Sequence, residues 1–175
     1  MESGLVHVYH GDGKGKTTAA IGLTLRALGY GWHVFIVQFL KGSTSGEVAM
    51  LEKLSGVRIL RGQVGTKFSF QMNEAEREEA RKLHHAHLQE AMEAAVREHY
   101  DLLILDEALG ACDCGLLDEN VLLQAIQGRP VGLEVVLTGR NPSKAVLDVA
   151  DYITEMKMQK HPYEQGQPAR KGIEF

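Results

Sequence analysis

The chain has 175 residues, of which 44% are hydrophobic and 24% are charged, as is typical of one globular domain with a single buried core. The formal net charge of −4 and the pI of about 6.1 exclude a general affinity for nucleic acid or anionic membranes. No apolar run is long enough to span a membrane, and the first residues lack the features of a signal peptide. We therefore expect a single cytoplasmic domain over residues 1–175, with neither a nucleic-acid nor a membrane partner.

Short apolar or β-branched runs alternate with amphipathic segments along the chain. Because most of the apolar runs have too few polar positions for a solvated face, they predict a parallel sheet covered by helices on both sides, as in an α/β doubly wound domain. We predict strands at 5–9, 33–40, 57–60, 101–107, 133–139 and 152–156, and helices at 17–29, 75–100, 116–126 and 142–150.

The stretch HGDGKGKTT, residues 10–18, follows the first predicted strand and opens the first predicted helix. It is similar to a phosphate-binding loop, except that His10 stands where the first glycine belongs. In this context glycines let backbone N–H groups point at phosphate oxygens, and the helix N-terminus adds positive potential. We therefore predict that Lys16 reaches the phosphates, that the Thr17 hydroxyl binds Mg²⁺, and that Lys14 adds a second cation.

Two acids close the predicted strand at residues 101–107, at the end where ligand sites gather in open α/β sheets. One of Asp106 and Glu107 can hold a Mg²⁺-bound water, and the other can contact the metal or act as a base. Acids at strand ends also serve as helix caps, so these two acids alone do not establish a metal site. The phosphate loop nearby favours the metal site over the helix cap. Arg140 ends another strand on the same side, and its sequence context alone leaves open whether it contacts phosphates.

Phe68 and Phe70 alternate in a polar, glycine-flanked segment before the long helix. Alternating aromatic side chains are most often part of a core. The alternative is that they form a pocket wall against a large flat apolar ligand.

Three histidines lie on the predicted long helix, which Asn73 and Glu76 begin as a capping box. Only His84 and His87 share a helix face, and no acid or cysteine completes a metal set. We expect the cluster, with His85, to belong to a solvated helix face.

Two cysteines, Cys112 and Cys114, are separated by one residue. A C-x-C pair alone is neither a zinc site nor a redox C-x-x-C motif. We expect two isolated buried thiols in a reducing compartment.

Seven segments in a fixed order resemble the P-loop type ATP:corrinoid adenosyltransferases, also called cob(I)alamin adenosyltransferases. The resemblance extends from about residue 5 to the C-terminus, and the segments are GDGKGKTTAA, VQFLKG, GTKFSF, LLILDE, VVLTGR, ADYITEM and KHPYEQGQPARKGIEF. It implies a P-loop NTPase-like, mostly parallel six-stranded sheet with helices on both faces, usually in a homodimer. It also implies transfer of the 5′-deoxyadenosyl group of ATP to the Co(I) centre of a reduced corrinoid, with release of triphosphate, in adenosylcobalamin biosynthesis or salvage.

The resemblance also assigns site residues. Glu107 is the acid that it favours for direct metal contact, beside Asp106 and Thr17, with Mg²⁺ or Mn²⁺ as the metal. The nucleotide-binding positions that it implies are Gly11, Asp12, Gly13, Lys14, Gly15, Lys16, Thr17, Thr18, Arg26 and Arg140. The catalytic positions that it implies are Lys16, Glu107, Phe68 and Phe70.

The aromatic segment carries a specific role in the family. By resemblance, Phe68 and Phe70 lie beside the corrinoid, crowd the lower face of the cobalt and displace its axial ligand, which makes reduction to Co(I) easier. A flavoprotein reductase that donates the electron is an implied partner. Many relatives cover the corrinoid with an additional N-terminal segment, whereas this sequence begins almost at the first strand. We expect a more open site, or closure by other parts of the chain.

The last residues, 157–175, are polar and rich in Gly, Pro, Lys and His. Their composition is compatible with a disordered tail. The apolar Ile173 and Phe175 at the end indicate instead that the segment folds back, and we expect it to pack in an extended form near the active site.

Other functions compete with the adenosyltransferase. An ordinary P-loop NTPase or kinase would share the loop and the metal site but cleave at the γ-phosphate. A nucleotide-gated corrinoid carrier would bind both ligands without turnover, and a nucleic-acid-dependent ATPase fits the acidic balance least well. In the family, the shifted loop accompanies ATP bound in reverse orientation, with its triphosphate held as a leaving group.

Overall fold

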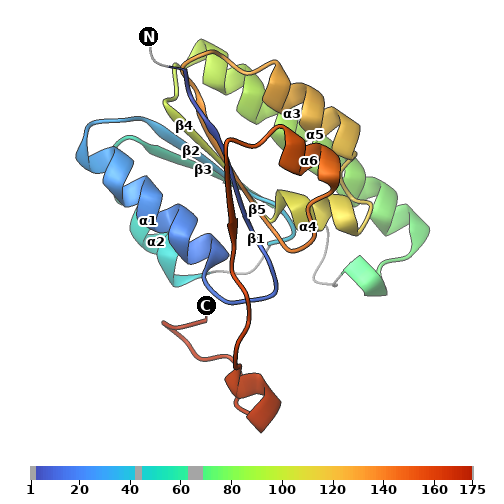
Figure 1. The fold of residues 1–175 in the computed structure, drawn as a ribbon. Helices are drawn as coiled ribbons and strands as arrows, with labels where there is room; N and C mark the ends of the chain where they lie inside the picture. The colour runs from blue at the N-terminus through green and yellow to red at the C-terminus, as the bar shows by residue number, and fades with distance from the viewer. Residues whose placement is uncertain (1–2, 42–44, 63–68, 175) are drawn as a thin grey trace.

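The computed structural model describes residues 3–41, 45–62 and 69–174, and Phe68 therefore lies outside the described residues (Figure 1). The strands are β1 (Val6–His10), β2 (Val34–Gln38), β3 (Val57–Arg61), β4 (Leu102–Asp106), β5 (Glu134–Thr138) and β6 (Tyr152–Glu155). The helices are α1 (Lys16–Gly29), α2 (Gly46–Leu51), α3 (Glu74–Arg97), α4 (Ala108–Asp113), α5 (Glu119–Gln127) and α6 (Lys144–Asp148), with short 3₁₀ turns η1 (Ser69–Gln71) and η2 (Pro162–Gln165).

The strands form one six-stranded sheet in the order β3-β2-β4-β5-β1-β6, and every neighbouring pair is parallel. Helices α1 and α2 cover one face, and α3, α4, α5 and α6 lie on the other (Figure 1). Each face has its own apolar cluster, so β2, β4 and β5 are buried on both sides. The predicted parallel α/β sheet is confirmed, and all of its pairs are parallel rather than most of them.

Two short helices were not predicted from the sequence. Helices α2 and α4 have six residues each, which is less than two helical turns and too short for a helical period to emerge. Helix α4 follows β4 directly, and its N-cap residue is Glu107. It therefore fixes the backbone of one of the two acids of interest.

The histidine prediction was wrong for two of the three residues. His84 and His87 are only 2% and 6% exposed, and α3 buries them in a stripe with alanines and Leu88. The ring of His84 meets Phe39 edge-on, with 5.5 Å between centroids. Burial lowers the pKa of His84 to about 4 and also lowers the pKa of His87. A stripe of histidine and alanine has low hydrophobicity, and the sequence therefore predicted a solvated helix face here.

The two cysteines are free and half-buried, so they are less enclosed than expected. Burial still raises the pKa of the Cys112 thiol to about 12, and this thiol is a poor nucleophile near neutral pH. Among the described residues, no helix is long and apolar enough to cross a membrane.

Candidate active site

His10 is the last residue of β1 rather than the first residue of the loop. It pairs with Glu155 of β6, and its carbonyl accepts a hydrogen bond of 2.7 Å from the N–H of Met156. The glycines follow from the same contact, because a Cβ on Gly11 or Gly13 would stand 2.5 or 2.6 Å from the Met156 carbonyl oxygen. The chain after β6 therefore sets which loop positions must be glycine.

The buried Lys16 points into the loop. Its Nζ donates to the carbonyls of Gly11 and Gly13 at 2.8 Å each, and burial lowers the pKa of its ammonium. Gly15 caps α1 with a φ of 117°, a conformation that favours glycine. Phosphate oxygens are the stronger acceptors for an ammonium. The loop therefore has the parts of an anion site, with its lysine held by weaker partners.

Asp106 is the centre of a polar network at the carboxyl edge of the sheet. Its side chain is 1% exposed. Its Oδ1 accepts from the hydroxyls of Thr17 at 2.8 Å and Thr138 at 2.7 Å. Its Oδ2 accepts from Gln38 Nε2 at 3.2 Å and Lys41 Nζ at 2.7 Å. The fold thus brings Thr17 of α1 to Asp106 of β4, as the predicted metal pair requires.

Glu107 has a left-handed backbone, with φ 59° and ψ 20°. This conformation costs free energy in a non-glycine residue, and such residues cluster at functional sites. Its N–H donates to Thr138 Oγ1 at 2.9 Å, while its side chain makes no capping hydrogen bond to α4. Burial, and secondarily the charge of Asp106, raises the pKa of the Glu107 carboxyl. The alternative that this acid is a side-chain helix cap is therefore not supported.

Hydroxyl and carboxylate oxygens of Thr17, Asp106 and Glu107 are the hard ligands that Mg²⁺ prefers. The ammonium of Lys41 already contacts the first two of these residues, at 3.1 Å from Thr17 Oγ1 and 2.7 Å from Asp106 Oδ2. A positive charge is thus compatible with this position. The described residues contain no group of three or more His, Cys, Asp or Glu side chains that could hold a metal, so a cation here would take further ligands from substrate or water.

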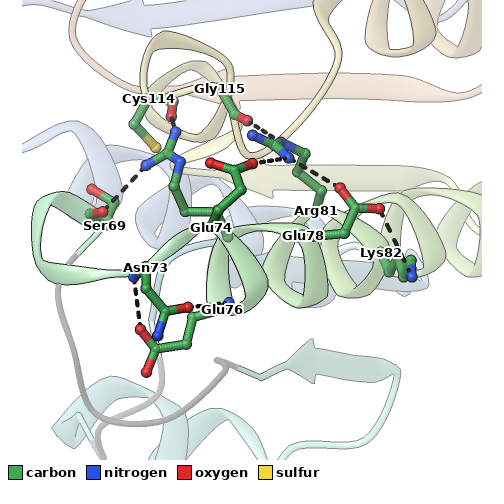
Figure 2. Close-up of polar contacts among 10 residues, drawn as sticks. Ser69, Asn73, Glu74, Glu76, Glu78, Arg81, Lys82, Cys114 and Gly115 are labelled. Carbon is green, nitrogen blue, oxygen red and sulfur yellow. Dashed lines mark hydrogen bonds and ion pairs between the residues drawn. The ribbon is translucent and has the colours of Figure 1, made fainter.

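The aromatic turn η1 is held by an arginine of α3 that also binds the end of α4. Phe70 is 81% exposed, so it is not a core residue. Arg77 of α3 donates to the Ser69 carbonyl at 3.2 Å and to the Cys114 carbonyl at 2.5 Å. Figure 2 shows these carbonyls beside the start of α3. Because Cys114 ends α4 and Glu107 begins it, one arginine joins the aromatic turn to the helix of the acidic site.

Arg81 reinforces the same junction one turn further along α3. Its Nε donates to the Gly115 carbonyl at 3.0 Å, and it pairs with Glu74 and Glu78 (Figure 2). The capping box predicted at the start of α3 is present, since the side chains of Asn73 and Glu76 each accept the other residue's N–H.

The C-terminal segment passes next to the loop. Lys14 Nζ donates to the Ile173 carbonyl at 3.1 Å and to Glu174 Oε1 at 3.0 Å. Arg170, and secondarily Lys14, lowers the pKa of the Glu174 carboxyl. Earlier in the segment, the N–H of Met158 donates to Asp12 Oδ1 at 3.0 Å.

Two cavities flank the loop. One, of about 350 Å³, is lined by Thr17, Thr18 and Lys41 together with residues 172–174. The other, of about 550 Å³, lies beside Gly11 and Asp12 and includes Arg140, whose carbonyl accepts from the Gly11 N–H at 3.2 Å. An elongated anion on the loop would therefore have space at both ends.

Arg26, which was predicted to bind the nucleotide, lies away from the phosphate loop. It lies ten residues after Lys16 on α1, which is about 15 Å along the helix axis. There it lines an apolar cavity with Tyr30 and Trp32. The structure brings the other described nucleotide positions to the loop or its rim.

Sequence reasoning missed Lys41 and Arg77. Lys41 does follow a buried strand, within the segment VQFLKG, and this position was a usable signal because the carboxyl ends of parallel strands share one edge. Arg77 gives no comparable signal, because its partners are backbone carbonyls.

A parallel α/β sheet with a glycine-rich loop, a buried loop lysine and an aspartate at the carboxyl edge defines a P-loop protein. Similar solved structures include the KaiC-like protein PH0186 from Pyrococcus horikoshii, with a TM-score of 0.57 and 14% identity over 90% of this chain and 73% of that chain. The cytoplasmic domain of EssC has a TM-score of 0.55 and 16% identity over 96% of this chain and 34% of that chain. At these identities the likeness shows the fold alone.

Within this class, the chain belongs to the ATP:corrinoid adenosyltransferase BtuR/CobO/CobP family, whose model matches residues 2–175. The corrinoid adenosyltransferase of Pseudomonas aeruginosa is 35% identical over 99% of this chain and 85% of its own length. The corrinoid adenosyltransferases of Escherichia coli K12 and Salmonella typhimurium are each 33% identical over 99% of this chain and 87% of their own length. The family resemblance is confirmed, and the chain is a transferase.

Proposed function

We propose that this enzyme transfers the 5′-deoxyadenosyl group of ATP to the Co(I) centre of a reduced corrinoid and releases triphosphate. The electron pair of Co(I) attacks C5′ of the ribose, the C5′–O bond breaks, and its electron pair leaves on the triphosphate. Family membership over residues 2–175 carries the proposal. The phosphate loop and the Thr17–Asp106 pair supply the parts that hold such a leaving group.

The substrate metal is itself the nucleophile, so the enzyme has no proton to remove. Its task is to position C5′ and to stabilise the negative charge that develops on the triphosphate. Lys16 and the N–H groups of residues 11–18 bind the phosphate oxygens, and Lys14 adds a second positive charge. Thr17, Asp106 and Glu107 would hold Mg²⁺ or Mn²⁺, which neutralises leaving-group charge when bound.

Reverse binding of ATP is consistent with the two cavities. The larger cavity includes Arg140 and Lys157 and suits the end of the triphosphate. The cavity beside Thr17 and Thr18, closed partly by residues 172–174, suits the adenosyl end. A structure with bound nucleotide that has the γ-phosphate beside Thr17 would contradict this orientation.

An exposed aromatic residue suits a flat apolar corrin ring. Phe70 is such a residue, and Arg77 connects its turn to the helix that follows Glu107. We infer that Phe70, with Phe68, forms the wall that displaces the axial ligand of cobalt.

Further partners follow from the family. We infer a homodimer, a flavoprotein that reduces Co(II), and a cytoplasmic location for one domain over residues 1–175. Sedimentation of the purified protein tests the dimer. Turnover with Co(II) corrinoid and a flavoprotein, but no chemical reductant, tests the electron donor.

The reaction is tested by its phosphorus product. The protein is incubated with ATP, Mg²⁺ and chemically reduced corrinoid, and products are identified by ³¹P NMR and visible absorption. Triphosphate together with a new cobalt–carbon absorption is the expected result. ADP and phosphate would instead identify an NTPase, and binding of both ligands without products would identify a carrier.

A further inference from the structure

Lys41 is the third residue after the end of β2 and covers the buried carboxylate of Asp106. Its Nζ donates to Asp106 Oδ2 at 2.7 Å and to Thr17 Oγ1 at 3.1 Å. The Lys41 side chain is 30% exposed and that of Asp106 is 1% exposed, so the ammonium lies between the carboxylate and solvent. The preceding residue, Leu40, has a left-handed backbone with φ 58°, which costs free energy in a leucine. The chain thus has a strained turn immediately before this lysine.

The charge of Asp106 is neutralised by Lys41. Its other side-chain partners among the described residues, Thr17, Thr138 and Gln38, are uncharged hydrogen-bond donors. A buried carboxylate is costly without a positive partner. Among the described residues, Lys41 supplies that partner at hydrogen-bond distance.

A divalent cation at this position would compete directly with Lys41. Both positive groups require the lone pairs of Asp106 Oδ2 and Thr17 Oγ1, and two cations in such close contact repel each other. The ammonium must therefore leave when a metal binds. Its flexible stem lines the cavity shared with Thr18, and an anion held by the loop is the nearest new partner.

We propose that Lys41 is a placeholder for the divalent cation. It neutralises Asp106 in the nucleotide-free enzyme, is displaced when the cation binds, and then pairs with the phosphate chain. This inference rests on the proposed function for the identity of that anion as triphosphate. The metal and the phosphate chain consequently bind with positive coupling. The metal replaces Lys41 at Asp106, and the phosphate chain then becomes the partner of the displaced Lys41.

Metal binding without turnover tests the proposal. Mn²⁺ binding to the enzyme is measured by electron paramagnetic resonance, first alone and then with inorganic triphosphate. Lys41→Met is expected to bind Mn²⁺ alone at least about tenfold more tightly than wild type and the Mn²⁺–triphosphate pair about tenfold more weakly. Lys53→Met removes the same charge from an exposed lysine after α2 and should leave both affinities unchanged.

The outcomes separate this inference from the proposed reaction. Unchanged or weaker binding of Mn²⁺ alone to folded Lys41→Met overturns the placeholder, even if wild type forms triphosphate. Release of ADP by wild type overturns the reaction but leaves the competition measured with Mn²⁺ alone intact. Should Lys41→Met fail to fold, Lys41→Gln retains an uncharged donor for Asp106 and must show the same two changes.

Discussion

Acidification should destabilise the fold through a histidine that lies outside the proposed site. His84 is 2% exposed and packs against Phe39, and burial lowers its pKa from 6.5 to about 4. Its Nδ1 has no hydrogen-bond partner in the described part of the chain. The folded enzyme therefore binds this proton poorly, whereas the unfolded chain binds it with the ordinary pKa.

The sign and size follow from linkage. Between pH 6.5 and about 4 the unfolded chain binds more protons at His84, so the free energy of unfolding falls as the pH falls through this window. At about 1.4 kcal/mol per pH unit, the contribution lost between pH 7.5 and pH 4.5 is roughly 2–3 kcal/mol. The lowered pKa of His87 acts in the same direction.

Urea unfolding at pH 7.5 and pH 4.5 measures this loss. His84→Leu keeps an apolar contact with Phe39 and removes the titrating group, so its loss of stability between the two pH values should be roughly 2–3 kcal/mol smaller than that of wild type. His33→Gln, whose parent side chain is 64% exposed, controls for the removal of one histidine. Parallel pH dependences for wild type and His84→Leu would refute the reasoning.

Three further predictions concern the loop and the aromatic turn. Gly13→Ala places a Cβ 2.6 Å from the Met156 carbonyl oxygen and should weaken ATP binding at least about tenfold in calorimetry. The control Gly22→Ala, whose Cβ meets nothing within 4 Å, should leave ATP binding unchanged. Equal affinities of the two variants would show that the loop can shift to accommodate the Cβ. Arg77→Met removes the hydrogen bonds to the Ser69 and Cys114 carbonyls, so it should weaken corrinoid binding in absorbance titrations and have little effect on ATP binding. An equal loss of affinity for both ligands would indicate general unfolding instead. Phe70→Ala should impair turnover more with Co(II) substrate and reductant than with preformed Co(I), and equal impairment would exclude its role in reduction.

The layered fold could be predicted from the sequence because the central strands are apolar on both faces. Strands such as β2 and β4 leave no alternative to a sheet covered by helices on both sides. Burial of His84 and His87 could not be predicted, because their stripe on α3 is otherwise largely alanine. In such a stripe, tertiary contacts such as that of His84 with Phe39, and not hydrophobicity, decide which residues are buried.

The loop and the two acids could be predicted because their residue types are tied to local geometry. The contacts of Lys41 could not, since they depend on β2 and β4 being neighbours although the β3 and α3 segments separate them in the sequence. The strand order determines which side chain reaches Asp106, and no local pattern encodes that order.

The displaced glycine pattern has a structural cause in the edge strand. Because His10 is paired with β6, the close approach of the Met156 carbonyl falls on Gly11 and Gly13 instead. The same segment continues to Met158, which holds Asp12, and ends at residues 172–174 beside Lys14 and Thr17. The loop is therefore shaped from outside by the C-terminal part of the chain, which also lines the cavity that we propose for the adenosyl group. His10, which departs from the standard loop pattern, and the C-terminal segment, which borders the proposed site of reaction, thus belong to one structural unit.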